Sequence, residues 1–499
     1  MAFKDMQEFV ALLEKHGELV RITAPVSRDL EITEIADRVM KGLAAKNKAL
    51  LFENVQGFST PVAINLFGSD KRMALALGVD DLDELNQRLA KLVDFRLPQG
   101  LGPMMDRAAD FFGALKGIGL GPTMVRSGPA QEVVETDSAS LSSLPVLKCW
   151  PGDGGRFITL MQVITRDPVS NARNVGLYRL QVLDDRRLAM HWQRHKGGAE
   201  HERKARELVG AGLVPVLAPG PAPTIPCAIV LGGDPASMWC ASAPLPPNID
   251  EYMLAGWLRG KPVEFVKCAT QPLEVPANAE IVIEGYVDPN EREIEGPFGD
   301  HTGYYTPAEP FPVFHVTAIT HRKSPVYPAT IVGVPPVEDV YLGKATERLF
   351  LPLMRLFLPE VLDYHMPPQG VFHNLVIVKI KKRYPGHARK VMFGVWGLGL
   401  LMLAKGVVVV DDWVDVHNLS EVAWQALGNV DWARDAVIVE GPVDHLDHAS
   451  YRHSFGGKIG VDATAKGPDE GYTRGWPEVA RMDEATKKKI DQMWGQLGL

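Results

Sequence analysis

The stretch IVIEGYVDPNEREIEGPFGDHTGYY, residues 281–305, decides how the centre of this chain is interpreted. It begins with the β-type run Ile281–Tyr286, and the glycines and proline after Glu295 prevent a regular helix in the part that follows. Further short β-type runs separated by Gly and Pro extend from about residue 127 to 320; they are 158–165, 175–183, 228–231 and 263–267. Their spacing favours a β-barrel or a β-sandwich in the central region.

The regions on either side of this β-rich centre alternate helical and extended patterns, as α/β domains do. Near the N-terminus, Asp5 and Glu8 have the spacing of a capping box, and Gly17 is typical of a helix end. A helix is therefore expected between Asp5 and Gly17. After residue 320, the continuous apolar runs LVIVKI and GVVVVDD are typical of strands that a parallel sheet buries on both faces. The sequence therefore predicts three domains, which are residues 1–126, 127–320 and 321–499.

The composition is that of an ordinary globular protein, and it excludes several classes of protein. The 499 residues are 46% hydrophobic, and a net charge of -8 without a basic run argues against nucleic acid as a partner. The 4 cysteines include no Cys-x-x-Cys pair, so a disulfide framework and structural zinc are unsupported, and a reducing cytoplasm is expected. The longest apolar stretch, Gly394–Ala404, is shorter than the ~18 residues of a membrane-spanning helix.

Polar groups concentrate in the segment 173–198 of the central region. Its candidate functional residues are Asn174, Arg179, His191 and His195, and the pair Gly197 and Gly198 closes the segment. Imidazole and amide groups are reasonable ligands for a divalent cation, and a glycine pair lets backbone N–H groups approach a phosphate. A hairpin with exposed polar residues is the alternative, and spacing alone does not decide between them.

Two acids in the opening stretch, Glu295 and Asp300, lie five positions apart in a loop that contains two glycines and a proline. Paired carboxylates beside an arginine are a standard arrangement for proton transfer, although such acids are also common in turns. Glu251 stands near the start of an expected helix, where it is either an N-terminal helix charge or a metal ligand. The string DHLDH, residues 444–448, looks like a metal cluster, but no further ligand of clear spacing accompanies it, so a polar loop is favoured.

Several strings along the chain together resemble the UbiD family of decarboxylases, which use prenylated flavin mononucleotide. The strings are GELVRITAPVSRDLEITEIADR, ALLFENVQG, LPVLKCWPGDGG, NVGLYR, EGPFGDHTGYY, GVPPVEDVYLG and KIGVDAT, and they cover nearly the whole length. The resemblance implies a UbiD-like three-domain α/β + β architecture. Its central domain would be a split β-barrel that binds the flavin, and its C-terminal α/β domain would drive oligomerisation to a homohexamer.

The resemblance also implies roles for individual residues. Arg179, Glu295 and Asp300 match the Arg-Glu-acid triad of the family, with Asp300 as the proton donor. The residues that match ligands of a divalent metal, usually Mn2+, are Asn174, Glu251 and, as in some members, His195; K+ is a further candidate cation. The residues that match contacts to the prenylated FMN are Leu177, Tyr178, Arg179, His191, Trp192, Gln193, Lys196 and Gly197.

The implied reaction is the non-oxidative decarboxylation of 4-hydroxy-3-polyprenylbenzoate to 2-polyprenylphenol in ubiquinone biosynthesis. A flavin prenyltransferase would supply the cofactor, and residues 97–126 are the candidate contact with the inner face of the cell membrane. Three histidines depart from the family pattern. An arginine is expected at the position of His191, and aromatic residues are expected at those of His445 and His448. Two alternatives stay open: a UbiD-type decarboxylase of another aromatic or α,β-unsaturated acid, for example in menaquinone synthesis, and an ordinary FMN oxidoreductase or flavin-binding module.

Overall fold

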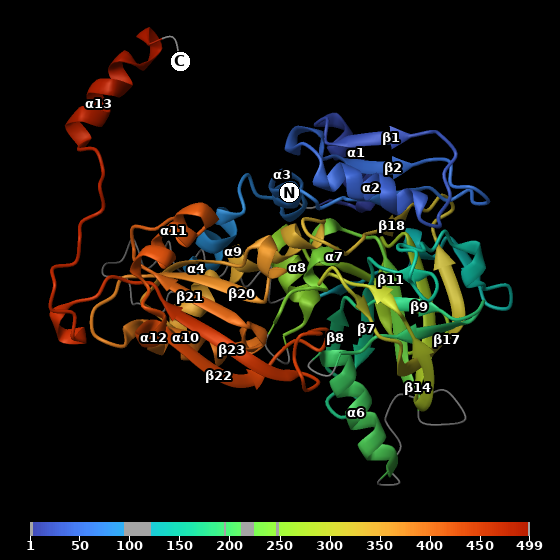
Figure 1. Ribbon diagram of the computed structural model, residues 1–499. Coiled ribbons are helices and arrows are strands. Elements are labelled where there is room, and N and C mark those ends of the chain that lie inside the picture. The colour runs from blue at the N-terminus through green and yellow to red at the C-terminus, as the bar shows by residue number, and fades with distance from the viewer. Residues whose placement is uncertain (1–2, 94–120, 194–195, 211–223, 246–248, 498–499) are drawn as a thin grey trace, which may run out of the picture.

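A computed structural model describes residues 3–93, 121–193, 196–210, 224–245 and 249–497. Its helices and strands form three regions, each built around a β-sheet (Figure 1). The N-terminal region, blue in Figure 1, covers one end of the green and yellow central region, and the orange and red C-terminal region lies beside both. The predicted order of an α/β, a β-rich and a second α/β region is confirmed. Most of the predicted membrane contact, residues 97–126, lies outside the described residues.

The N-terminal sheet has the strand order β1–β2–β3–β18, and its last strand comes from far along the chain. The strands are β1 (Leu19–Ile22), β2 (Ala49–Phe52), β3 (Val62–Ile64) and β18 (Tyr327–Ala329), and the helices are α1 (Met6–Lys15), α2 (Glu31–Lys41), α3 (Asp70–Leu77) and α4 (Asp83–Val93). Helix α1 begins where the sequence predicts, because the Asp5 carboxylate accepts the N–H of Glu8 at 2.9 Å. Strand β18 pairs in parallel with β3, so the chain returns to the N-terminal sheet after it has formed the central one.

The central region contains a sheet whose two longest strands carry part of the candidate site. Strands β14 (Ile281–Glu295) and β17 (Glu309–His321) pair antiparallel, and Glu295 lies directly opposite Glu309. The other strands are β5 (Val133–Glu135), β6 (Phe157–Ile158), β7 (Gln162–Arg166), β8 (Arg173–Gly176), β9 (Leu180–Val182), β10 (Arg187–Met190) and β11 (Ile225–Leu231). The pairings follow the path β6–β9–β10–β17–β14–β11–β7–β8, and the two end strands do not pair with each other in the described part of the chain.

Two of the predicted β-type runs are each divided in the structure. The run 158–165 separates into β6 and β7, and the run 175–183 separates into β8 and β9 at Leu177–Arg179. There the backbone leaves the ladder, and the N–H of Leu177 donates to the carbonyl of Ala241 at 2.9 Å. A continuous strand would fix each side chain to one face of the sheet by simple alternation, and the break removes that restriction at Arg179.

Helices and two small sheets complete the central region. The helices are α6 (Gly197–Gly210), α7 (Pro235–Cys240) and α8 (Glu251–Arg259), and the small sheets join β4 (Thr123–Met124), β12 (Glu264–Lys267) and β13 (Glu274–Pro276), and β15 (Phe298–Gly299) and β16 (Tyr305–Thr306). Helix α8 has the Asp250 side chain as its N-cap, since that carboxylate accepts the N–H of Tyr252 at 2.9 Å. This cap fixes Glu251 in the first turn of the helix.

The C-terminal region is a sheet of order β19–β20–β21–β23–β22 with helices around it. Its strands are β19 (Val361–His365), β20 (Leu375–Ile380), β21 (Gly406–Val410), β22 (Ala436–Pro442) and β23 (Phe455–Asp462), and its helices are α9 (Asp339–Phe357), α10 (His387–Trp396), α11 (Leu419–Asn429), α12 (Trp432–Asp435) and α13 (Glu484–Met493). Strands β20 and β21 are the two apolar runs that the sequence predicts for a parallel sheet, and they pair in parallel. Helix α13 stands away from the sheets in Figure 1. In the described part of the chain, no helix is long and apolar enough to cross a membrane.

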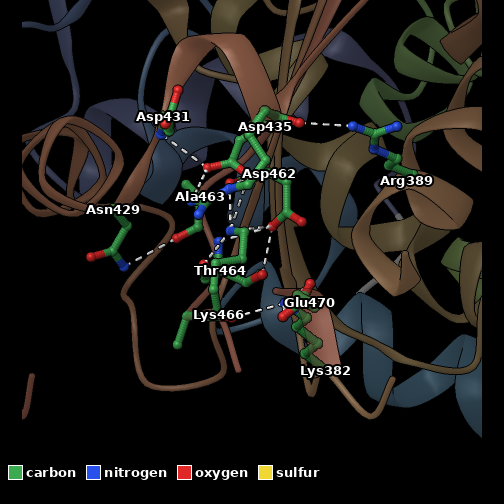
Figure 2. Close-up of polar contacts among 12 residues, drawn as sticks. Lys382, Arg389, Asn429, Asp431, Asp435, Asp462, Ala463, Thr464, Lys466 and Glu470 are labelled. Atoms are coloured by element: carbon green, nitrogen blue, oxygen red, sulfur yellow. Dashed lines mark hydrogen bonds and ion pairs between the residues drawn. The ribbon is translucent and has the colours of Figure 1, made fainter. Parts of the chain in front are cut away.

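A network of polar side chains surrounds Lys466, just after β23 (Figure 2). Lys466 is 4% exposed, and its ammonium donates to the carbonyl oxygens of Asp462 at 3.0 Å and Thr464 at 2.5 Å. The carboxylates of Asp462 and Asp435 lie 3.3 and 3.8 Å from the same nitrogen. Because a buried charge is stable only where such partners replace water, this network holds the end of β23 to α12.

Replacing Lys466 by Met should lower the thermal unfolding temperature of the C-terminal region, because the buried Asp462 carboxylate loses its cation, whereas Asp435 keeps Arg434 at 2.7 Å. Breaking a buried ion pair from one side costs about 3 to 5 kcal/mol. Lys487→Met on the exposed helix α13 is the matched control, and it should change stability by less than about 0.5 kcal/mol. Differential scanning calorimetry measures both variants, and equal effects would contradict the role given to Lys466.

Candidate active site

Arg179, Glu295 and Asp300, the predicted triad, lie in direct contact. The Arg179 guanidinium donates from Nε to Glu295 Oε1 at 2.7 Å and from Nη2 to Glu295 Oε2 at 3.0 Å, which makes a bidentate pair. Its Nη1 donates to the Asp300 carboxylate. The Glu295 side chain is fully buried, and those of Arg179 and Asp300 are 8% and 9% exposed. The fold thus joins residues that are up to 121 positions apart in the sequence.

Three separate elements position this triad. Arg179 stands in the break between β8 and β9, Glu295 ends β14, and Asp300 follows β15. Thr306 Oγ1 accepts a further N–H of Nη2 at 3.0 Å, and the ring of Phe298 lies 4.9 Å from the guanidinium carbon. Among the described residues Nη1 has no acceptor besides Asp300, so one of its two hydrogens is available to a ligand.

Opposite charges outweigh burial for both acids of the triad. Burial raises the pKa of Glu295, but hydrogen bonds from His191 and Arg179 bring it below its usual value. Burial also raises the pKa of Asp300, and Arg179 and His301 more than offset this, so that it lies well below the usual range. Both acids are therefore ionised at neutral pH in this arrangement.

His191, predicted as a cofactor contact, touches the triad directly. Its Nδ1 lies 3.1 Å from Glu295 Oε2, and its ring centroid lies 4.2 Å from that of Phe311. Burial and the nearby Arg179 lower the pKa of His191, so the imidazole is neutral and carries its proton on the Nδ1 that donates to Glu295. Its Nε2 is buried and has no partner among the described residues. The predicted contact with a cofactor stays a prediction.

The structure adds His301, His373 and Asp339, which the sequence analysis did not single out. His301 Nδ1 lies 3.0 Å from Asp300 Oδ1, and His301 Nε2 lies 2.9 Å from His373 Nε2. Burial lowers the pKa of His301, but the Asp300 carboxylate offsets this and raises it overall. Burial and the charge on His301 lower the pKa of His373 to about 4, so His301 carries the extra proton and donates to His373.

Asp339 is a second acid near this histidine, and its Oδ2 atom is buried. Burial raises its pKa to about 7, against the opposing effect of His301. His301 could have been found from the sequence, because it directly follows Asp300. Asp339 begins α9 and His373 lies between β19 and β20, and no local pattern relates either of them to Asp300.

Asn174 and Glu251, the predicted metal ligands, form a second group with the glycine pair. Glu251 Oε2 accepts the N–H of Val175 at 3.0 Å, which places it beside the strand that carries Asn174. A Cβ on Gly197 would lie 1.9 Å from Asn174 Oδ1, so only glycine fits there. Burial raises the pKa of Glu251 to about 7, and the opposing effect of Arg173 is too small to compensate. An amide oxygen and such a carboxylate suit a hard divalent cation.

The remaining predicted cofactor residues lie around this second group. Tyr178 is buried, and its hydroxyl oxygen accepts the N–H of Gly198 at 3.2 Å. Trp192 is 4% exposed, and its Nε1 has no acceptor among the described residues. Such a buried donor, together with the N–H groups that begin α6, fits an anionic group such as a phosphate. Gln193 and Lys196 border residues 194–195, and His195 itself lies outside the described residues.

Comparisons with known proteins identify the family. Models of the N-terminal, Rift-related and C-terminal domains of 3-octaprenyl-4-hydroxybenzoate carboxy-lyase match residues 10–92, 123–335 and 340–463. The chain belongs to the UbiD family. Its relatives include an uncharacterized protein of Aquifex aeolicus, 51% identical over 498 residues and matched across 100% of this chain and 99% of that protein. An uncharacterized protein of Archaeoglobus fulgidus is 49% identical with the same coverage.

Solved UbiD structures share the fold described above. The closed form of vanillic acid decarboxylase from Sedimentibacter hydroxybenzoicus has a TM-score of 0.85 at 28% identity, with 99% of both chains covered. The UbiD-class enzyme HmfF of Pelotomaculum thermopropionicum, in complex with FMN, has a TM-score of 0.79 at 31% identity, with 97% of this chain and 98% of that chain covered. The predicted three-domain UbiD architecture is confirmed, and the chain is a carboxy-lyase of this family.

Asp300→Asn should lower the pKa of His301, because the carboxylate that stabilises the imidazolium is removed. The pKa is measured by NMR titration of protein that carries isotope-labelled histidine. Asp363→Asn is the matched control, because it removes a carboxylate that contacts a different histidine, His417, at 3.2 Å, and it should leave the titration of His301 unchanged. An unchanged His301 in Asp300→Asn would contradict the charge assignment.

Proposed function

We propose that this UbiD-family protein removes CO2 from an aromatic acid with prenylated FMN as its cofactor. The observation that carries the proposal is the buried triad, in which Arg179 offers a free donor to a carboxylate beside two acids. The similar structures support the same chemistry: one is a vanillic acid decarboxylase, HmfF is in complex with FMN, and an evolved dimeric form of HmfF is in complex with prFMN.

Asn174 and Glu251 would hold a divalent cation such as Mn2+, and the start of α6 with Trp192 Nε1 would bind the cofactor phosphate. Binding of the cation would restore the charge of Glu251, whose pKa is raised by burial. K+ is a further candidate at the same phosphate. The prenylated flavin, when bound, would supply an electrophilic ring that can accept the electron pair left by the departing CO2.

Arg179 would bind and orient the substrate carboxylate. Glu295 holds the guanidinium through two hydrogen bonds, so Nη1 keeps a fixed direction. A carboxylate that accepts from Nη1 brings a second negative charge to Asp300, which shares this nitrogen. Like charges at short distance raise a carboxyl pKa, so substrate binding increases the proton affinity of Asp300.

Asp300 would then deliver the proton to the carbon that has lost CO2. His301 is its source, because His301 Nδ1 is 3.0 Å from Asp300 Oδ1 and the Asp300 carboxylate raises the pKa of His301, which favours its protonated form. The hydrogen bonds from His191 and Arg179 keep Glu295 ionised, so Glu295 does not compete for this proton. Asp300 would therefore stay deprotonated, and unable to donate a proton, until the substrate is bound.

The specific substrate that we propose first is a 4-hydroxy-3-polyprenylbenzoate, converted to a 2-polyprenylphenol. The description of the matching family models names this type of substrate. One of the similar enzymes of known structure is a vanillic acid decarboxylase, so another aromatic or α,β-unsaturated acid fits equally well. A flavin prenyltransferase would have to supply the cofactor. Assembly of the chain into a homohexamer belongs to the same proposal.

The decisive experiment couples the mass of the cofactor to a panel of acids. The protein is coexpressed with a flavin prenyltransferase, the released cofactor is weighed by mass spectrometry, and CO2 is measured for a polyprenylated hydroxybenzoate, for vanillate and for simple acrylic acids. We expect prenylated FMN and CO2 from at least one aromatic acid, and a loss of about 100-fold or more in Asp300→Asn. Unmodified FMN with NAD(P)H turnover would favour the oxidoreductase alternative and contradict the proposal.

Gly197→Ala should weaken binding of both the cation and the flavin, because the new Cβ would lie 1.9 Å from Asn174 Oδ1 and displace it. Gly428→Ala is the matched control, since no atom lies within 4 Å of a Cβ at that position of α11. Flavin absorbance and bound manganese after gel filtration report the effect. Retention of both at the level of the control would contradict the cradle assigned to Gly197.

A further inference from the structure

Three residues that border the active site, Glu309, His445 and His453, form the interdomain His–Glu cluster, and the ring centroid of His445 lies 6.2 Å from that of His191. One ligand atom of each lies within 4.8 Å of the others. Glu309 begins β17 of the central sheet, and the two histidines lie in the connection 443–454 between β22 and β23 of the C-terminal sheet. His445 Nε2 is 3.2 Å from Glu309 Oε2, and the two imidazole centroids are 4.1 Å apart. The cluster therefore joins two regions of the molecule.

Glu309 needs a positive charge because of its place in the sheet. It lies directly opposite Glu295 on the paired strands β14 and β17, and like charges in that position repel. Glu295 has Arg179 as its partner, whereas Glu309 forms no ion pair with a lysine or arginine among the described residues. In the described part of the chain the Glu309 carboxylate has His445 and His453 as neighbours, and a neutral imidazole offers one nitrogen lone pair to a ligand.

The connection that carries the two histidines is held in place by its own contacts. The N–H of Val443 donates to the carbonyl of Ser454 at 3.2 Å and closes its base. Asp444 accepts the N–H of Leu446 at 2.8 Å, and Lys405 pairs with Asp447 at 2.8 Å. His445 and His453 are thus presented together by a shaped loop, eight positions apart in the sequence.

A second group of similar composition, called the satisfied cluster, already has partners within the chain for its charges and hydrogen bonds. Glu347, His365 and His417 also bring their ligand atoms within 4.8 Å. There Lys344 lies 3.2 Å from the Glu347 carboxylate and donates to His417 Nδ1 at 3.0 Å, while His417 Nε2 contacts Asp363. Lys344 already supplies the positive charge that Glu347 needs. A metal ion would therefore find no free lone pair on His417 and no uncompensated negative charge.

We propose that the interdomain His–Glu cluster binds a divalent transition-metal ion such as Zn2+. Two imidazoles and one carboxylate are the donor set of open zinc sites, in which water takes the fourth position. Ligand atoms around tetrahedral zinc lie roughly 3.3 Å apart, which the His445–Glu309 distance of 3.2 Å already meets. His453 is exposed and the Glu309 side chain is 34% exposed, so an ion can enter from solvent. The bound ion would tie the C-terminal region to the strand opposite Glu295.

Co2+ is the probe, because tetrahedral Co2+ absorbs visible light much more strongly than octahedral Co2+. The flavin-loaded full-length protein is treated with a chelator, restored with Mn2+, and titrated with Co2+. We expect one equivalent to give intense visible bands that Zn2+ abolishes, whereas Co2+ at the oxygen-rich site of Asn174 and Glu251 is octahedral and gives weak bands. In Glu309→Gln and His453→Ala the affinity for Co2+ should fall by about ten-fold or more.

His417→Ala is the matched control, since it removes a histidine from the satisfied cluster, and it should keep the bands at full intensity. Glu309→Gln preserves shape at a half-buried position, and circular dichroism and retained flavin check that both variants fold. Zn2+ should raise the unfolding temperature of the wild type and leave that of Glu309→Gln unchanged. Weak bands in the wild type, or intense bands that survive in both variants, would overturn the proposal.

Discussion

The bidentate ion pair between Arg179 and Glu295 is the interaction on which the rest of the site depends. A fully buried carboxylate is costly unless a cation meets it with good geometry, and Glu295 has that cation. To reach it, Arg179 must leave the strand alternation between β8 and β9, and β14 must extend to Glu295. The same guanidinium then fixes Asp300 through Nη1. One pair thereby positions both acids and, together with His191 and His301, keeps them ionised.

The histidines around the triad divide into neutral and charged members, and their surroundings determine which is which. His191 is buried beside Arg179 and stays neutral, while His301 faces Asp300 and holds a proton. His373, which accepts from His301, belongs to the C-terminal region. The chemistry of the central sheet thus depends on side chains that a different region supplies. In a UbiD-family carboxy-lyase, this makes the contact between the regions part of the site.

Local sequence information predicted the parts of this structure that are local. The apolar runs at 375–380 and 406–412, the cap at Asp5 and the acid pair Glu295 and Asp300 were all visible, because their residues are neighbours. The division of the run 175–183 was not, since a buried ion pair with a residue 116 positions away overrides the local β pattern there.

The string DHLDH was set aside because no companion ligand was spaced nearby in the sequence. Glu309 lies 136 positions from His445, and only the packing of two sheets brings them together. The same holds for His373, which meets His301 across 72 positions. Sequence spacing finds sites within one element, and it misses those that form where separate elements meet.

The return of the chain to the N-terminal sheet has a consequence for biosynthesis. Strand β18, residues 327–329, completes a sheet whose other three strands all lie before residue 65. The edge of β3 therefore stays unpaired until a segment that is synthesised much later is available. Chains emerge from the ribosome at about 5 to 20 residues per second, so the interval is on the order of tens of seconds. During that time an open strand edge is exposed, and the nascent chain must be protected from pairing with other chains.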